Sequence, residues 1–175
     1  MMGMKRIKEF GIFMLFTALL ISDSACSQNS WTKIKYTYDA GSLPPPYKYN
    51  YTLTISNDGN AELVYKTGYS GNEKSTFNYN VEINDYMFKT LQNEIRESKV
   101  LNQRIEQMPS SEIPDGGYSD YLQIYNGDEL ISSVPSYPDS KYKESLDKIY
   151  KALFKCIPDE IWKEIESKKS EIIGN

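Results

Sequence analysis

The segment Pro44-Pro45-Pro46-Tyr47-Lys48-Tyr49-Asn50-Tyr51-Thr52-Leu53-Thr54-Ile55-Ser56 shows the clearest pattern in the chain. From Tyr47 onward, aromatic and aliphatic residues alternate with polar ones. Successive side chains of a β-strand point to opposite faces, so this alternation predicts a half-buried strand with a wet outer face. The predicted inner face carries Tyr47, Tyr49, Tyr51, Leu53 and Ile55, and the outer face carries Lys48, Asn50, Thr52, Thr54 and Ser56.

Three more segments alternate in the same way, at residues 31–38, 61–69 and 74–83. The turn signal Asn57-Asp58-Gly59-Asn60 predicts a hairpin between the strand at residues 47–56 and the one at residues 61–69. Residues 70–73 predict another turn. Short turns make neighbouring strands antiparallel. The three prolines cannot lie in a central strand, so they predict a connection stiffened toward polyproline II. The same prolines have a second interpretation, as a recognition loop for an aromatic partner.

At Asn84-Asp85 the apolar period changes from two to about 3.6, which predicts a capped helix with a buried stripe. The stripe contains Met87, Phe88, Leu91 and Ile95. Residues 102–117 are polar and contain two prolines, so they predict a long loop. Residues 118–125 and 129–134 flank Asn126-Gly127, which predicts a second hairpin with a type I′ turn.

The C-terminal part predicts two helices, the second beginning at Pro158. The apolar positions of the first are Tyr142, Leu146, Ile149, Tyr150, Leu153 and Phe154, and those of the second are Ile161, Trp162, Ile165 and Ile172. Together the elements predict a single α+β domain at residues 31–175. It contains an antiparallel sheet of four to six strands, with one helix after the first four strands and two C-terminal helices packed on it.

The first 25 residues have the order of a secretory signal peptide. Basic residues precede an apolar run at residues 10–21, and small residues follow: the basic ones are Lys5, Arg6 and Lys8, and the small ones are Ser22, Ser24 and Ala25. The run is too short to cross a bilayer of about 30 Å as a helix. Residues 1–25 are therefore interpreted as a cleaved leader.

A small residue followed by Cys26, just after the apolar run, resembles the lipobox of bacterial lipoproteins. That resemblance implies that Cys26 becomes the acylated first residue, that residues 26–30 form a tether, and that the membrane is a partner through the lipid. Ser27 is not the Asp that marks retention in the inner membrane, so the resemblance implies an outer-membrane lipoprotein of the cell envelope. Asp23 departs from the apolar residue preferred there, and cleavage by ordinary signal peptidase is the alternative.

Composition narrows the function classes. The net charge is −4, which disfavours nucleic acid as a partner. There is no His, so the commonest general base and zinc ligand are absent. Cys156 is interpreted as a small buried apolar residue. No catalytic, phosphate-binding or metal-binding motif occurs, so the sequence predicts no cofactor, no metal site and no catalytic residue.

Two function hypotheses remain. The favoured one is a binding or accessory module that recognises a protein or an envelope polymer, a class that includes inhibitor and immunity-type proteins. Its candidate binding residues are Pro44, Pro45, Pro46, Tyr47, Tyr118 and Tyr121. The alternative is an envelope hydrolase that uses carboxylates near residues 112–120 as acid and base, drawn from Glu106, Glu112, Asp115 and Asp120.

Overall fold

The structure is a computed structural model that describes residues 30–69 and 76–174, with side chains up to residue 171. The chain divides into two compact units, Met1–Ser30 and Trp31–Asn175, and only the second is described here. The predicted leader and Cys26 lie outside the described residues. So do the predicted turn at residues 70–73 and the side chain of Ile172.

The second unit contains one six-stranded antiparallel sheet with the strand order β4-β3-β2-β1-β5-β6. The strands are β1 (Lys33–Asp39), β2 (Tyr49–Ser56), β3 (Asn60–Thr67), β4 (Thr76–Glu82), β5 (Ser119–Asn126) and β6 (Glu129–Val134). The longer helices are α2 (Asp85–Ser98), α3 (Lys143–Lys155) and α4 (Asp159–Gly174), and the short 3₁₀ turns are η2 (Ser110–Glu112) and η3 (Ser140–Tyr142). The α+β prediction is confirmed.

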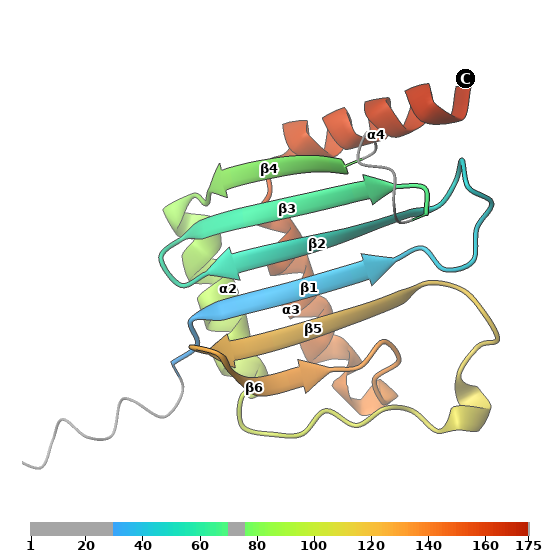
Figure 1. Ribbon diagram of the computed structural model, residues 1–175. Helices are drawn as coiled ribbons and strands as arrows, with labels where there is room; N and C mark the ends of the chain where they lie inside the picture. Colours follow the sequence, from blue (N-terminus) through green and yellow to red (C-terminus); the bar gives the residue numbers. More distant parts are fainter. Residues whose placement is uncertain (1–29, 70–75, 175) are drawn as a thin grey trace, which may run out of the picture. The chain divides into compact units, whose positions relative to one another are not determined.

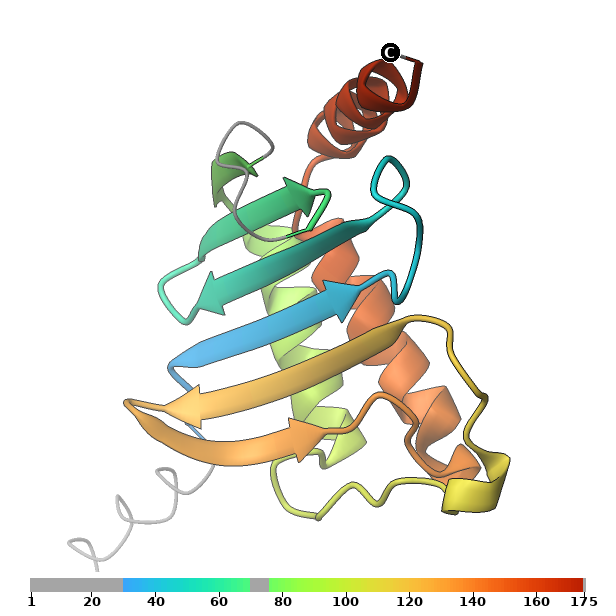
Figure 2. The same cartoon turned by 45° about the vertical axis from the view of Figure 1, so that its right-hand side comes forward.

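The helices cover one face of the sheet and leave the other open (Figure 1). In the turned view, α2 and α3 lie side by side behind the strands (Figure 2), and α4 contacts β4 through the Tyr79 hydroxyl, which donates to Glu164 at 3.2 Å. The open face carries the polar residues of the alternating pattern. This arrangement follows from the sequence, because each strand has one apolar face and each helix has one apolar stripe to bury.

Strand register arranges the covered face in rows that change character from one end of the sheet to the other. The row nearest the start of β1 is aliphatic and contains Ile124, Ile34, Ile55, Ala61 and Val81. The next row contains Leu122, Tyr36, Leu53, Leu63 and Tyr79. The third row contains Asp120, Tyr38, Tyr51, Tyr65 and Phe77. The core is therefore driest where β1 begins and becomes aromatic and polar where β1 ends.

The predicted helix signals are confirmed. The Asn84 side chain accepts a hydrogen bond from the Tyr86 N–H at 2.9 Å and caps α2. Leu91 and Ile95 of α2 are buried, as are Leu146, Ile149 and Leu153 of α3. The next helix, α4, begins directly after Pro158, and its Trp162 ring packs edge-on against Tyr51.

Cys156 is buried, as predicted, at the end of α3. Its thiol donates to the Ala152 carbonyl at 3.4 Å, and burial raises the pKa of the thiol to about 12. The thiolate, which is the reactive form of cysteine, is therefore disfavoured.

Two predictions of loop conformation are wrong. In the second hairpin Gly127 has φ +58°, whereas φ of Asp128 is not positive. Among the described residues, Lys99 is the one non-glycine residue with a positive φ. A type I′ turn needs positive φ at both central residues, so this turn is not type I′. The proline connection is also not polyproline II: the Pro44 carbonyl accepts from the N–H groups of Tyr47 and Lys48, which closes a compact turn.

Candidate recognition surface at one end of the sheet

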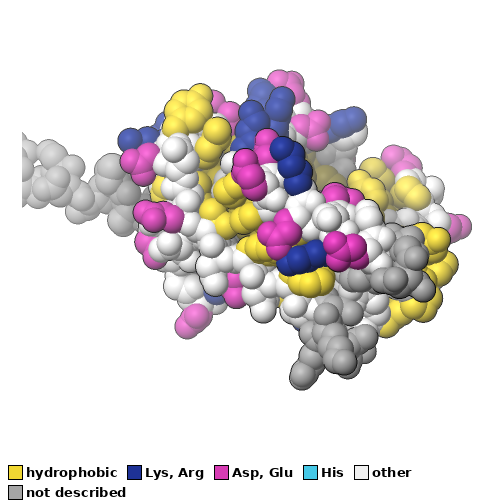
Figure 3. Space-filling view, turned by 90° about the horizontal axis from the view of Figure 1, so that it is seen from above, with side chains coloured by type: hydrophobic (Ala, Val, Ile, Leu, Met, Phe, Trp, Pro, Cys, Tyr) yellow, Lys and Arg dark blue, Asp and Glu magenta, His cyan; other side chains and the backbone are white. Residues whose placement is uncertain are grey.

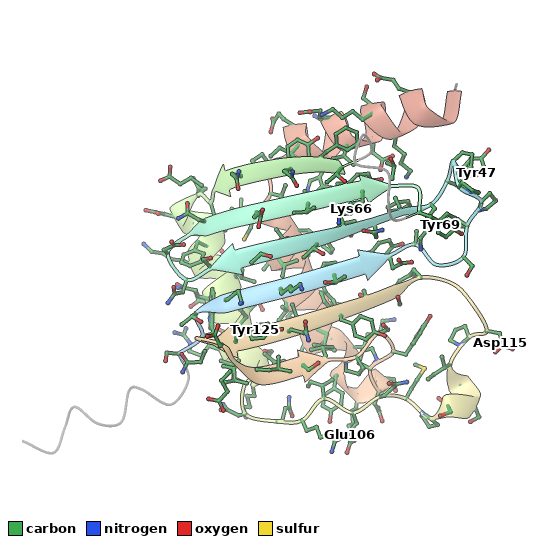
Figure 4. All side chains as sticks on the ribbon, viewed as in Figure 1. Tyr47, Lys66, Tyr69, Glu106, Asp115 and Tyr125 are labelled. Carbon is green, nitrogen blue, oxygen red and sulfur yellow. The ribbon has the colours of Figure 1, made fainter. Side chains whose placement is uncertain are left out.

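Exposed apolar side chains gather where β1 ends and β2 begins. Tyr69 lies just after β3, and its hydroxyl donates to the Leu43 carbonyl at 2.7 Å, which joins the two loops. We call this the loop-end surface, made of Leu43, Pro44, Pro45, Pro46, Tyr47 and Tyr69, all of them exposed. Figure 4 shows Tyr47 and Tyr69 on neighbouring loops at this end. In the view from above, hydrophobic side chains gather at the same right-hand end (Figure 3).

A buried lysine stabilises the loop that connects β1 to β2. Lys48 is only 8% exposed, pairs with the Asp39 carboxylate, and donates to the Gly41 carbonyl at 2.7 Å. The Gly41 N–H also donates to Asp39, at 2.7 Å. Burial alone would raise the pKa of Asp39, but the hydrogen bonds from Lys48 and Gly41 outweigh it and lower the pKa. The turn at residues 44–47 is therefore tied to the end of β1.

The predicted faces of Tyr47 and Lys48 are wrong, since Tyr47 is exposed and Lys48 is buried. The reason is that β2 begins only at Tyr49. The two preceding residues belong to the proline turn, where side chains do not alternate as they do in a strand. The strand therefore begins two residues later than the alternation predicts.

We expect Lys48→Ala to lower the free energy of unfolding by about 1–3 kcal/mol, because it removes the buried ammonium group that pairs with Asp39 and donates to the Gly41 carbonyl. The matched control is Lys66→Ala, on the open face of β3, where Lys66 is exposed (Figure 4). That change should stay within about 0.5 kcal/mol. Urea unfolding of both variants measures the difference, and equal midpoints would show that Lys48 does not support the loop.

The loop before β5 also reaches this end of the sheet, where Gly117 lies against Gly41. Gly41 has φ +79°, and a Cβ placed on it would lie 1.9 Å from the Gly117 carbonyl oxygen. The two backbones can approach so closely only because residue 41 has no side chain. Tyr118 follows directly, and its carbonyl accepts from the Tyr137 hydroxyl at 2.8 Å.

From Tyr118 a stack of tyrosine rings crosses the covered face of the sheet. The ring centroids of Tyr118 and Tyr38 are 5.5 Å apart, those of Tyr38 and Tyr51 are 5.1 Å apart, and those of Tyr51 and Tyr65 are 6.2 Å apart. Tyr118 is 52% exposed, whereas Tyr65 is fully buried. Lys169 of α4 lies over the neighbouring Tyr49 ring, 4.4 Å from its centroid. The stack thus joins the loop end to the core.

Asp120 lies at the β5 end of this tyrosine row. It is half-buried and accepts from the Tyr36 hydroxyl at 3.1 Å. Burial raises the pKa of Asp120, and the hydrogen bond from Tyr36 offsets only part of that effect. The carboxyl group is therefore easier to protonate than an ordinary aspartate.

This pKa shift predicts how stability varies with pH. The pKa of Asp120 is higher in the folded chain than its ordinary value of 3.8. As pH rises, the folded chain therefore keeps this proton up to a higher pH than the unfolded chain does. The free energy of unfolding should therefore fall as pH rises from about 4 through the folded-state pKa. Asp120→Asn should remove this slope, as urea unfolding across that range would measure. The exposed Asp115→Asn is the control, and an unchanged slope in Asp120→Asn would contradict the prediction.

The carboxylates that the hydrolase hypothesis requires do not lie together in one site. Glu112 and Asp115 are exposed, and Glu106 pairs with Lys141 of η3. Figure 4 shows Glu106 and Asp115 far apart on the long loop. Among the described residues, no other carboxylate contributes to the pKa shift of Asp120. In the part of the chain that the structure describes, the hydrogen-bond partner of the Asp120 carboxylate is Tyr36 and not a second acid.

The six binding residues predicted from sequence do not share one surface. Residues 44–47 belong to the loop-end surface, and Tyr118 lies across the contact between Gly41 and Gly117. Tyr121, 49% exposed, pairs with Thr37 on the open face, because it lies three positions after Tyr118 and an odd offset places two residues on opposite faces. Sequence reasoning missed Tyr69, because it assigned this residue to the strand predicted at residues 61–69. Gly68, with φ +73°, ends the strand pattern before Tyr69 and was the available signal.

No model of a known protein family matches this chain, and no curated protein is significantly similar to it. Within residues 30–69 and 76–174, the structure contains no helix that is both long and apolar enough to span a bilayer.

Proposed function

We propose that this protein is a lipid-anchored binding module of the bacterial cell envelope that recognises a protein or polymer partner through the loop-end surface. One observation carries the proposal: exposed Leu, Pro and Tyr side chains lie on a turn that the buried Lys48 stabilises by donating a hydrogen bond to the Gly41 carbonyl. Tyrosine offers a large contact area with few rotatable bonds, and a loop that is already ordered loses less entropy on binding.

Binding is favoured over hydrolysis for a structural reason. A glycosidase-type mechanism needs two carboxyl groups that flank one substrate bond. Asp120 has tyrosines around it instead, and the other acidic residues of the loop are exposed or paired with lysine. The aromatic loop end provides contact area, which is what a recognition surface requires.

The recognition site can be tested with Tyr47→Ala and a matched control, Tyr86→Ala, which removes another exposed tyrosine from the start of α2. Binding is measured separately to solubilised outer-membrane proteins and to purified peptidoglycan. Loss of a central tyrosine should weaken binding about 30-fold, corresponding to about 2 kcal/mol. Tyr86→Ala should bind normally. Equal binding by the two variants in both arms would overturn the proposed site.

The lipid anchor is supported by the N-terminal sequence, in which a charged segment, a short apolar run and small residues precede Cys26. Cys26→Ala should move the protein from the membrane fraction to the soluble or precursor pool. Several acyl chains on one residue give stable anchoring, and without them no anchor remains. Mass spectrometry of the mature N-terminus provides the direct measurement. An unmodified terminus, or cleavage elsewhere, would indicate an ordinary secreted protein.

A further inference from the structure

A groove lies along the outer side of β6, at one edge of the sheet, two strands from β1 in strand order. Residues 101–107 form its other wall, and its volume is about 960 Å³. That volume is at the upper end of the range for ligand pockets, roughly 300–1,000 Å³. We call it the β6 groove; its lining includes Leu130, Ile131 and Ser133 of β6, Tyr121 of β5, and Arg104 and Gln107 of the loop.

The loop wall is held in place by several hydrogen bonds, so the groove is formed before any partner binds. The Tyr142 hydroxyl donates to the Arg104 carbonyl at 3.2 Å, and the Asp139 N–H donates to the Glu106 carbonyl at 2.9 Å. The buried Ser132 hydroxyl donates to the Val100 carbonyl at 2.7 Å. This last bond joins β6 to the backbone just after the end of α2.

The backbone of β6 is paired on one side only. It pairs with β5, and among the described residues no backbone hydrogen bond joins it to the loop that runs beside it. An edge strand presents a row of N–H and C=O groups that another strand can pair with. Two exposed apolar side chains, Leu130 (47% exposed) and Tyr121, stand beside this row.

We propose that the β6 groove binds an extended peptide segment of a partner protein, which adds to the sheet as a seventh strand. Backbone pairing supplies the affinity in this mode, and side-chain contacts supply the specificity. The six residues of β6 span about 20 Å, and Ile131 forms a bulge in this strand, because Ser132 pairs with Ile124 while Leu130 pairs with the next residue, Tyr125. The peptide therefore pairs with no more than a few residues around Leu130–Ser133. This site is separate from the loop-end surface and does not depend on it.

The test uses the purified mature protein and a phage-displayed library of linear peptides as the probe. Peptides that bind are then measured by amide hydrogen exchange and against two variants. We expect the β6 amides near Leu130 to become protected, and Leu130→Lys to weaken peptide binding at least about tenfold. Leu43→Lys changes an exposed leucine of the loop-end surface, away from the β6 groove, and should leave peptide binding unchanged.

Three results would overturn the proposal. One is that no peptide binds, and another is that protection maps to residues 43–47 while Leu43→Lys abolishes binding. The third is that the free protein self-associates with protection of β6, which would make a second copy the occupant. Failure of the loop-end proposal would appear differently, as normal partner binding by Tyr47→Ala.

Discussion

Leu53→Ala should lower the free energy of unfolding by about 2–5 kcal/mol, the cost of removing a large aliphatic side chain from a packed core. Leu53 is fully buried and lies in β2, with Tyr36 of β1 and Leu63 of β3 as its cross-strand neighbours. Those neighbours belong to strands paired on both sides, so they cannot collapse into the space left behind. Urea unfolding monitored by tyrosine fluorescence measures the change.

The control for Leu53 is the adjacent residue on the open face. Thr52→Ala removes a side chain that points away from the helices, and it should cost less than about 1 kcal/mol. A loss as large for Thr52→Ala as for Leu53→Ala would mean that the two faces of β2 have been assigned the wrong way round.

Gly41→Ala should lower the free energy of unfolding by about 2–6 kcal/mol. Two costs combine at this position. An L-residue is strained at φ +79°, and the added Cβ would lie 1.9 Å from the Gly117 carbonyl oxygen, so one of the two loops has to move. That movement would also displace the Lys48 and Asp39 pair beneath the loop-end surface.

Gly59→Ala separates the two costs. Gly59 has φ +87°, but a Cβ there meets no atom within 4 Å. Its substitution should therefore cost only the backbone strain, about 1–2 kcal/mol. A similar loss for both glycines would show that the close contact with Gly117 does not exist in solution.

Local patterns were sufficient to predict most of the fold. Alternation identified the strands, because a sheet with one covered face requires a period of two. The change of period at Asn84 identified α2, and the hairpin signals identified both tight connections. The inward side of Leu53 and the burial of Cys156 also followed from pattern and composition. These features depend on residues close together in the chain, whose preferences the fold does not override.

The details of the candidate sites depended on contacts between distant residues. The burial of Lys48 requires the turn at Pro44 to fold back onto Asp39, and the pattern of alternation contains no sign of it. Tyr69 joins the loop-end surface through a hydrogen bond to Leu43, 26 residues earlier. The place of β6 at the sheet edge follows from strand order, which puts β5 beside β1.

The sequence alone therefore predicted an α+β domain, its strand faces and an N-terminal leader ending before Cys26. Strand order, loop packing and the close approach of Gly41 to Gly117 came from the tertiary structure alone. The physical reason is the range of the interactions. Alternation and capping act over a few residues and leave a local pattern, whereas a recognition surface forms where loops far apart in sequence meet, and no local pattern records that meeting.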